Sequence, residues 1–284
     1  MKAASGSSDF LAVMARTSRR RWKKLAVRVP RSELEARARA LPPPLPLRTS
    51  AQGFDVIAEI KFASPSSGAL AHEATVGQAA RLARSYSVAG AAALSVLTEP
   101  RRFAGSIAHL CAASRWSRVP VLRKDFLVDA LQVLEARAAG ASGVLLVLRL
   151  LDAAHLDAML DEASTLGLFA LLEAFDERDL ERAAAVVAAR PGQGLLVGVN
   201  ARDLATLAVD PARHRVLAPA LPRGVPCVAE SGLASPDDAR AVAAAGYRLA
   251  LVGSALQRAP DANSLIVEMI AAGRAAASTR SVAP

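Results

Sequence analysis

Residues 56–68 read VIAEIKFASPSSG, a short apolar run that contains two charged residues and ends in small polar residues and a proline. Glu59 and Lys61 are two positions apart, and side chains alternate across a strand, so both point to the same face. A buried carboxylate and a buried ammonium group are costly unless they are paired or used in chemistry. The stretch therefore predicts a buried strand whose end carries charges that need an explanation.

The same pattern recurs along the chain, where short apolar runs alternate with Ala-rich amphipathic stretches. The predicted strands are residues 54–61, 92–98, 120–125, 143–148, 168–174, 195–200, 227–230 and 249–252. They recur roughly every 23 to 38 residues, a spacing that fits one strand and one helix per unit.

Helix boundaries between these strands have recognisable signals. Ser235 is a predicted N-cap with Pro236 at the first helical position, Asp176 begins another helix, and Gly140 follows the last turn of a third. The strands are almost continuously apolar, as parallel strands covered by helices should be.

Eight strand–helix units predict an α/β protein with a (β/α)8 TIM barrel. The alternative is a doubly wound open sheet. That fold favours a GxGxxG turn after an early strand, and the sequence has none.

Composition and residue spacing argue against a membrane-spanning protein, a secreted protein and a metalloprotein. The 284 residues are 52% hydrophobic but only 4% aromatic, and they contain no apolar run of transmembrane length and no evident signal peptide. Cys111 and Cys227 lie far apart, which favours two reduced thiols in a cytoplasmic protein. The four histidines share no ligand spacing, so no metal site is expected.

Charge divides the chain into two predicted domains. The net charge is +9, and residues 1–50 contain 12 basic and 3 acidic residues, so the remainder is neutral. We expect a basic helical arm with a Pro-rich linker over residues 1–50, and a barrel over residues 51–284. The cluster at residues 19–24 fits a solvated helix face, an anion-binding surface or a targeting signal.

Polar residues follow most of the predicted strands. Lys61, Lys124, Glu173, Asn200 and Glu230 each end an apolar run, and in a barrel such ends meet at one catalytic mouth. This set favours proton transfer and carbonyl activation. Glycine and serine after the last two strands, Gly232, Gly253 and Ser254, predict a phosphate site.

Long motifs at these strand ends resemble the indole-3-glycerol-phosphate synthase family of tryptophan biosynthesis. The resemblance runs through IAEIKFASPSSG, LSVLTEPRRFAGS, PVLRKDFLVDALQVLEARAAGASGVLLV, LLEAFDERDL, VGVNARDLATLAVD, VAESGL and LVGSAL. It covers nearly the whole chain, and the arm is similar to the helical segment that precedes the barrel in that family.

The resemblance implies closure of the indole ring of 1-(o-carboxyphenylamino)-1-deoxyribulose 5-phosphate with loss of CO₂ and water, without cofactor or metal. It implies that Lys124 activates the carbonyl, that Lys61 is the acid in dehydration and that Glu59 is the base. The other implied catalytic residues are Glu173, Asn200, Glu230 and Ser231. The implied substrate-binding residues are Arg202 for the benzoate carboxylate, Phe126 and Leu204 for the ring, and Ser64, Gly232, Gly253 and Ser254 for the phosphate.

Three positions depart from the family pattern. Phe62 replaces a basic residue, Ser67 replaces a lysine and Phe175 replaces a common histidine. These changes leave open a paralogue that acts on a modified anthranilate-derived substrate. A different phosphate-binding barrel isomerase and a non-enzymatic binding protein on a decayed barrel are also compatible with the barrel pattern. The expected partner is a small phosphorylated substrate, with no nucleic acid, no membrane and possible non-covalent contact with neighbouring pathway enzymes.

Overall fold

The computed structural model describes residues 7–64, 68–69, 74–204 and 206–281. Eight parallel strands form a closed barrel in the order β1-β10-β9-β8-β7-β6-β5-β4. Their bounds are β1 Asp55–Ile60, β4 Ala93–Leu97, β5 Val121–Lys124, β6 Gly143–Val147, β7 Phe169–Ala174, β8 Leu195–Asn200, β9 Cys227–Glu230 and β10 Leu249–Val252. The predicted (β/α)8 barrel is confirmed, and the predicted strands agree with these within two residues at each end.

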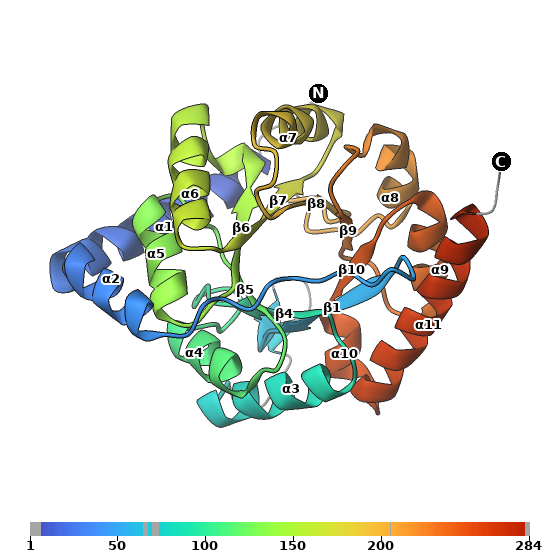
Figure 1. Ribbon diagram of the computed structural model, residues 1–284, viewed down its shortest axis with the longest axis horizontal. Coiled ribbons are helices and arrows are strands. Elements are labelled where there is room, and N and C mark those ends of the chain that lie inside the picture. Colours follow the sequence, from blue (N-terminus) through green and yellow to red (C-terminus); the bar gives the residue numbers. More distant parts are fainter. Residues whose placement is uncertain (1–6, 65–67, 70–73, 205, 282–284) are drawn as a thin grey trace.

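Helices surround the barrel (Figure 1). They are α3 Val76–Val88, α4 Ile107–Trp116, α5 Ala130–Ala138, α6 Ala153–Thr165, α7 Glu177–Ala189, α8 Ala212–Leu217, α9 Pro236–Ala245, α10 Ser254–Arg258 and α11 Ala262–Ser281, with short turns η1 Leu148–Leu150 and η2 Ala218–Ala220. A two-stranded antiparallel pair, β2 Ala63–Ser64 and β3 Gly68–Ala69, follows β1 and was not predicted.

The predicted helix boundaries are present. Ser235 and Asp238 form a reciprocal capping box at α9 with Pro236 in the first turn. The Asp176 side chain accepts a hydrogen bond from the Asp179 N–H at the start of α7. Gly140 has a φ of 91°, the left-handed conformation that glycine adopts without strain after a helix.

Alternation along β1 separates two apolar layers. Val56, Ala58 and Ile60 pack into the cluster between strands and helices, whereas Ile57 belongs to the cluster inside the barrel. Glu59 therefore points into the barrel, as the sequence predicts.

The N-terminal arm forms helices α1 Ser7–Arg28 and α2 Arg31–Ala40, which confirms the predicted helical extension. Met14 and Ser18 of α1 are buried, whereas Arg20, Lys23 and Lys24 are exposed. The linker after α2 then runs across one end of the barrel to reach β1 (Figure 1).

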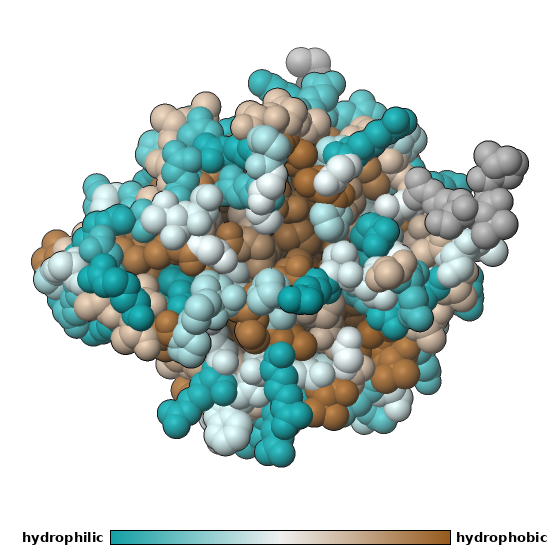
Figure 2. Space-filling view, viewed as in Figure 1, coloured by the Kyte–Doolittle hydropathy of each residue, from teal (hydrophilic) through white to brown (hydrophobic). Residues whose placement is uncertain are grey.

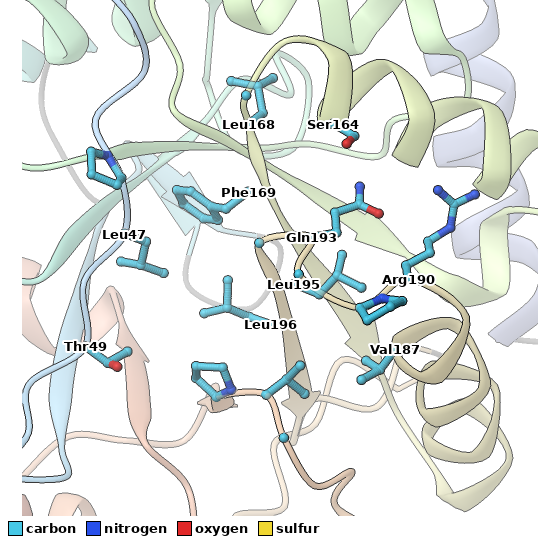
Figure 3. Close-up of a pocket in the computed structure, with 18 of the residues that line it drawn as sticks. Leu47, Thr49, Ser164, Leu168, Phe169, Val187, Arg190, Gln193, Leu195 and Leu196 are labelled. Carbon is cyan, nitrogen blue, oxygen red and sulfur yellow. The ribbon is translucent and has the colours of Figure 1, made fainter.

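That end of the barrel is apolar near its middle (Figure 2). A cavity of about 800 Å³ opens between the linker and the amino ends of β7 and β8. Figure 3 shows Leu47 and Thr49 of the linker on one side and Phe169, Leu195 and Leu196 on the other. Catalytic groups of such barrels lie at the carboxyl ends of the strands, so this cavity lies away from the expected site.

Helix α11 lies so close to β1 that only glycine fits at residue 273. A Cβ there would lie 2.0 Å from the Phe54 ring, which is fully buried. We expect Gly273→Ala to lower the free energy of unfolding by about 1–3 kcal/mol, because overpacking forces the ring or helix to shift. Urea unfolding followed by circular dichroism measures this.

The matched control is Gly77→Ala near the start of α3, where the nearest atom to a new Cβ is an arginine side chain at 3.7 Å. That variant should be neutral or slightly stabilising, because alanine favours helix. Equal effects in the two variants would contradict the packing argument.

Candidate active site

Charged side chains from four strands meet at the carboxyl end of the barrel. Lys61 Nζ lies 2.9 Å from Glu59 Oε1, at the end of β1. Lys124 Nζ, at the end of β5, lies 3.1 Å from Glu173 Oε1 and 2.7 Å from Glu230 Oε2. Each cation therefore has a carboxylate partner, so the apparent cost of burying Glu59 and Lys61 is offset by pairing.

An amide joins this network from β8. Asn200 Nδ2 donates to Glu173 Oε1 at 2.8 Å, while its own Oδ1 accepts from the Arg202 N–H at 2.9 Å. Asn200 thereby links the Lys124 partner to the loop that holds Arg202. The predicted residues Glu59, Lys61, Lys124, Glu173, Asn200 and Glu230 are thus brought together in one site.

Two carboxyl groups in this site have opposite pKa shifts. Burial raises the pKa of Glu59, but the charges of Lys61 and Lys124 outweigh burial and hold it below its usual value. Burial raises the pKa of Glu230 to about 8, and the nearby charges of Glu173 and Glu59 add to this rise while Lys124 opposes it. Titratable groups whose surroundings push their pKa values apart are suited to act as base and acid in one reaction.

Lys124 is held as a cation. Burial alone would lower its pKa, but Glu173, Glu230 and Glu59 raise it well above the usual lysine range. The ammonium group therefore stays protonated and donates hydrogen bonds to Glu173 and Glu230.

A cavity of about 290 Å³ lies beside these charges and has a glycine-lined wall. Gly232 has a φ of 77°, and the Cβ of any other residue at position 253 would lie 2.3 Å from Glu59 Oε1. The backbone can therefore approach a ligand closely here. Of the predicted residues, Ser231, Gly232, Gly253 and Ser254 line this cavity.

Arg258 also lines this cavity, with its side chain exposed, and was missed in the sequence. Its position four residues after Ser254 in a short helix is the only signal that could have indicated it. Ser64 lies in β2, next to residues whose placement is not described, and Ser67 lies outside the described residues.

A second cavity adjoins the same charged groups, and eight apolar side chains among the described residues also line it. Phe126 and Leu204, both predicted, line it together with Phe10, Leu97, Phe103, Leu145, Val147 and Leu207. The Phe10 and Phe126 rings meet edge to face, with centroids 5.9 Å apart. Glu59, Lys61, Lys124, Arg202 and Ser231 line both cavities, so an aromatic group and an anionic group of one ligand can flank them.

Arg202 lies between the two cavities, and its Nη1 donates to the Leu207 carbonyl at 2.8 Å. Burial lowers the pKa of Arg202, although Glu59 partly opposes this. Its planar guanidinium is suited to binding a carboxylate through two parallel hydrogen bonds.

The departures from the family pattern have structural partners. Phe62 is buried against His109, with ring centroids 4.7 Å apart, and lines neither cavity. Phe175 lies beneath the Arg149 guanidinium, 5.0 Å from the ring centroid, and lines a neighbouring cavity of about 600 Å³. Of these two phenylalanines, only Phe175 therefore borders a cavity near the charged network.

The described residues contain no cluster of His, Cys, Asp or Glu suited to holding a metal ion. Within those same residues no helix has the length and apolar character needed to cross a membrane.

Comparisons with known proteins agree with this geometry. The family model described as indole-3-glycerol phosphate synthase matches residues 12–269. The chain belongs to the indole-3-glycerol phosphate synthase family. The match begins inside α1, so the family resemblance includes most of the arm as well as the barrel.

Curated relatives with that name are similar over most of their length. The Mycobacterium avium protein is 44% identical over 244 residues, which cover 85% of this chain and 86% of the relative. The Nocardioides sp. protein is 49% identical over 219 residues, which cover 77% and 81%.

A solved structure, thiamine phosphate pyrophosphorylase from Pyrococcus furiosus, superposes with a TM-score of 0.55 at 15% identity. The superposition covers 79% of this chain and 97% of the solved structure. At this identity the likeness supports the fold alone.

Proposed function

We propose that this protein converts 1-(o-carboxyphenylamino)-1-deoxyribulose 5-phosphate to indole-3-glycerol phosphate, with loss of CO₂ and water, in tryptophan biosynthesis. The observation that supports this most strongly is the buried charged network, which borders both a cavity with aromatic and aliphatic side chains and a glycine-lined cavity. The substrate has an aromatic ring at one end and a phosphate at the other, with the reacting carbonyl between them.

The substrate ends have distinct binding groups. The ring packs between Phe126 and Leu204, and its carboxylate pairs with the Arg202 guanidinium. The phosphate binds beside Gly232, Gly253 and Ser254. The two glycines have no Cβ atom, so their backbone can approach the phosphate closely. Ser64 and Ser231 complete the proposed set.

Ring closure needs a proton donor for the carbonyl oxygen as the carbon–carbon bond forms. Lys124 supplies it from a pair of carboxyl groups, Glu173 and Glu230, that hold its ammonium in place. The new carbon–carbon bond uses a π-electron pair of the aromatic ring. When CO₂ leaves, the electron pair of the broken bond stays in the ring and restores its aromaticity. Asn200 holds Glu173 in the position that Lys124 requires.

Dehydration needs an acid for the leaving hydroxyl and a base for the ring proton. Lys61 is the acid and Glu59 is the base in this step. Lys61 Nζ and Glu59 Oε1 lie 2.9 Å apart, so Glu59 passes the proton that it has removed back to Lys61 after each turnover. The low pKa of Glu59 keeps it ionised at neutral pH, as a base must be.

Incubation of the purified protein with the carboxyphenylamino-deoxyribulose phosphate tests the proposal, with indole fluorescence as the readout. Fluorescence should rise with turnover, and a parallel reaction with phosphoribosylanthranilate should give no product. Absence of indole product while the substrate still binds would refute the synthase activity. Isomerisation of phosphoribosylanthranilate would instead favour a barrel isomerase.

A bell-shaped pH profile is expected from the two carboxyl groups. Ionisation of Glu230 puts a second negative charge against Lys124 and makes that lysine a weaker acid. Because the pKa of Glu230 is about 8, kcat/KM should fall as the pH rises through about 8. Glu230→Gln keeps a neutral partner for Lys124, so its alkaline limb should move to higher pH. An unchanged limb in that variant would remove Glu230 as its cause.

Four expectations remain proposals. A cytoplasmic location fits two free cysteine thiols, Cys111 and Cys227. We also propose that nucleic acid is not a partner, since Arg21 and Arg31 of the basic arm pair with carboxylates of the same chain. We propose that contact with neighbouring pathway enzymes is non-covalent. We also propose that the chain divides at residue 50 into the N-terminal arm and the catalytic barrel.

A further inference from the structure

One face of α1 lies against the barrel. Phe10, Met14, Ser18 and Arg21 follow each other at helical spacings of three or four residues, so they share that face. Phe10 meets Phe126, and Ser18 is fully buried and accepts a hydrogen bond from Gln132 Nε2 at 3.0 Å. The helix is therefore fixed along its length, from the ring cavity outward.

Arg21 makes a polar contact with Asp125, the residue that follows Lys124 in the chain. Its Nη1 and Nη2 donate to the two oxygens of Asp125 at 2.7 and 2.6 Å. The Asp125 side chain is completely buried, whereas that of Arg21 is 27% exposed. Asp125 directly follows Lys124, so the contact joins α1 to the residue beside the proposed acid.

Asp125 also organises the turn after β5. Its Oδ1 accepts from the Phe126 N–H at 2.8 Å, and its Oδ2 accepts from the Thr98 hydroxyl at 2.7 Å. These two donors, and the Arg123 guanidinium at 3.6 Å, remain if the Arg21 side chain is removed. Loss of Arg21 therefore leaves Asp125 partly compensated, and the barrel should still fold.

We propose that Arg21 is a positioning residue for the reaction: its forked contact with Asp125 holds α1 against the mouth of the barrel. In that position Phe10 closes the ring cavity against Phe126, and the turn after Lys124 is fixed. The kinetic part of this inference rests on the proposed function, whereas the docking of α1 through Arg21 does not.

The chain offers an optical reporter for this docking. Trp22 follows Arg21 and is half-buried, and the only other tryptophan, Trp116, is 51% exposed on α4. In a Trp116→Phe background, the emission and acrylamide quenching of Trp22 report whether α1 lies on the barrel.

The test compares Arg21→Met and Arg21→Lys with Arg20→Met in that background. Arg20 is the adjacent exposed residue of the same helix, so its replacement removes the same charge without touching Asp125. Arg21→Met should increase the quenching of Trp22 and lower kcat/KM by about 10- to 100-fold, as small misplacements of reacting groups do. Arg21→Lys should recover only part of this, because an ammonium group cannot make the forked contact.

The outcomes separate the claims. Turnover lost with Trp22 quenching unchanged would overturn the docking, and increased quenching with kcat/KM equal to that of Arg20→Met would overturn the positioning role. In an Asp125→Asn background, Arg21→Met should add little further loss, and a full additional loss would overturn action through Asp125. If the Trp116→Phe protein with no other change shows no turnover, the proposed function fails, while the quenching of Trp22 still tests the docking of α1.

Discussion

Replacing Lys124 with methionine should reduce kcat by about 10³- to 10⁴-fold, the upper range for loss of a positioned general acid. The physical reason is specific to this site, because Lys124 is the cation that contacts both Glu173 and Glu230. Methionine preserves most of the stem but cannot protonate the carbonyl oxygen. Single-turnover assays should show neither CO₂ release nor indole formation, since ring closure precedes both.

Two further measurements make this result interpretable. Lys24→Met on the exposed face of α1 is the matched control and should keep normal turnover. Circular dichroism should show a folded barrel for Lys124→Met, because Glu230, with a pKa of about 8, is mostly neutral at pH 7 and Glu173 keeps its hydrogen bond from Asn200. Near-normal turnover by the folded variant would remove Lys124 from the role of acid.

The barrel and most of its catalytic mouth could be predicted from sequence because both depend on local pattern. An apolar run followed by a charged residue fixes a strand and the end at which its side chain emerges. Lys124 and Glu230 are 106 residues apart, and each could be identified from its own strand end alone.

The pairing between those residues could not be predicted, because it depends on barrel closure and register. Neither could the role of the arm. Phe10 and Arg21 appear in sequence as an isolated aromatic residue and one charge in a basic cluster, and Arg21 meets Asp125 across 104 residues. The spacing of Phe10 and Arg21 on one helical face could have indicated a docking surface. The residues that this face contacts, Asp125 and Phe126, follow a strand that is distant in the sequence.

The opposite pKa shifts of the two carboxyl groups are also a property of the folded site. Glu59 and Glu230 look alike in sequence, because each is a glutamate in or at the end of an apolar run. Lys61 and Lys124 keep the pKa of Glu59 low, whereas burial beside Lys124 raises that of Glu230. This difference in pKa supports the proposal that Glu59 acts as a base while Glu230 stays protonated near neutral pH.

Replacing Glu59 with glutamine should lower steady-state kcat by about 10²- to 10⁴-fold, through loss of a general base. Glutamine has nearly the same shape but cannot take the ring proton, and Lys61 loses its charged partner. The defect should differ in kind from that of Lys124→Met. With ring closure and CO₂ loss still possible, a burst of CO₂ stoichiometric with enzyme should precede the slow appearance of indole.

The matched control is Glu181→Gln, a change of the same chemistry on the exposed surface of α7. It should leave both the burst and the steady-state rate unchanged. If Glu59→Gln instead abolishes the CO₂ burst, Glu59 acts before or during ring closure, and its assignment to dehydration is wrong. If indole forms at the normal rate, the proton is removed by another group, and Glu173 becomes the remaining carboxylate beside both the ring cavity and Lys124.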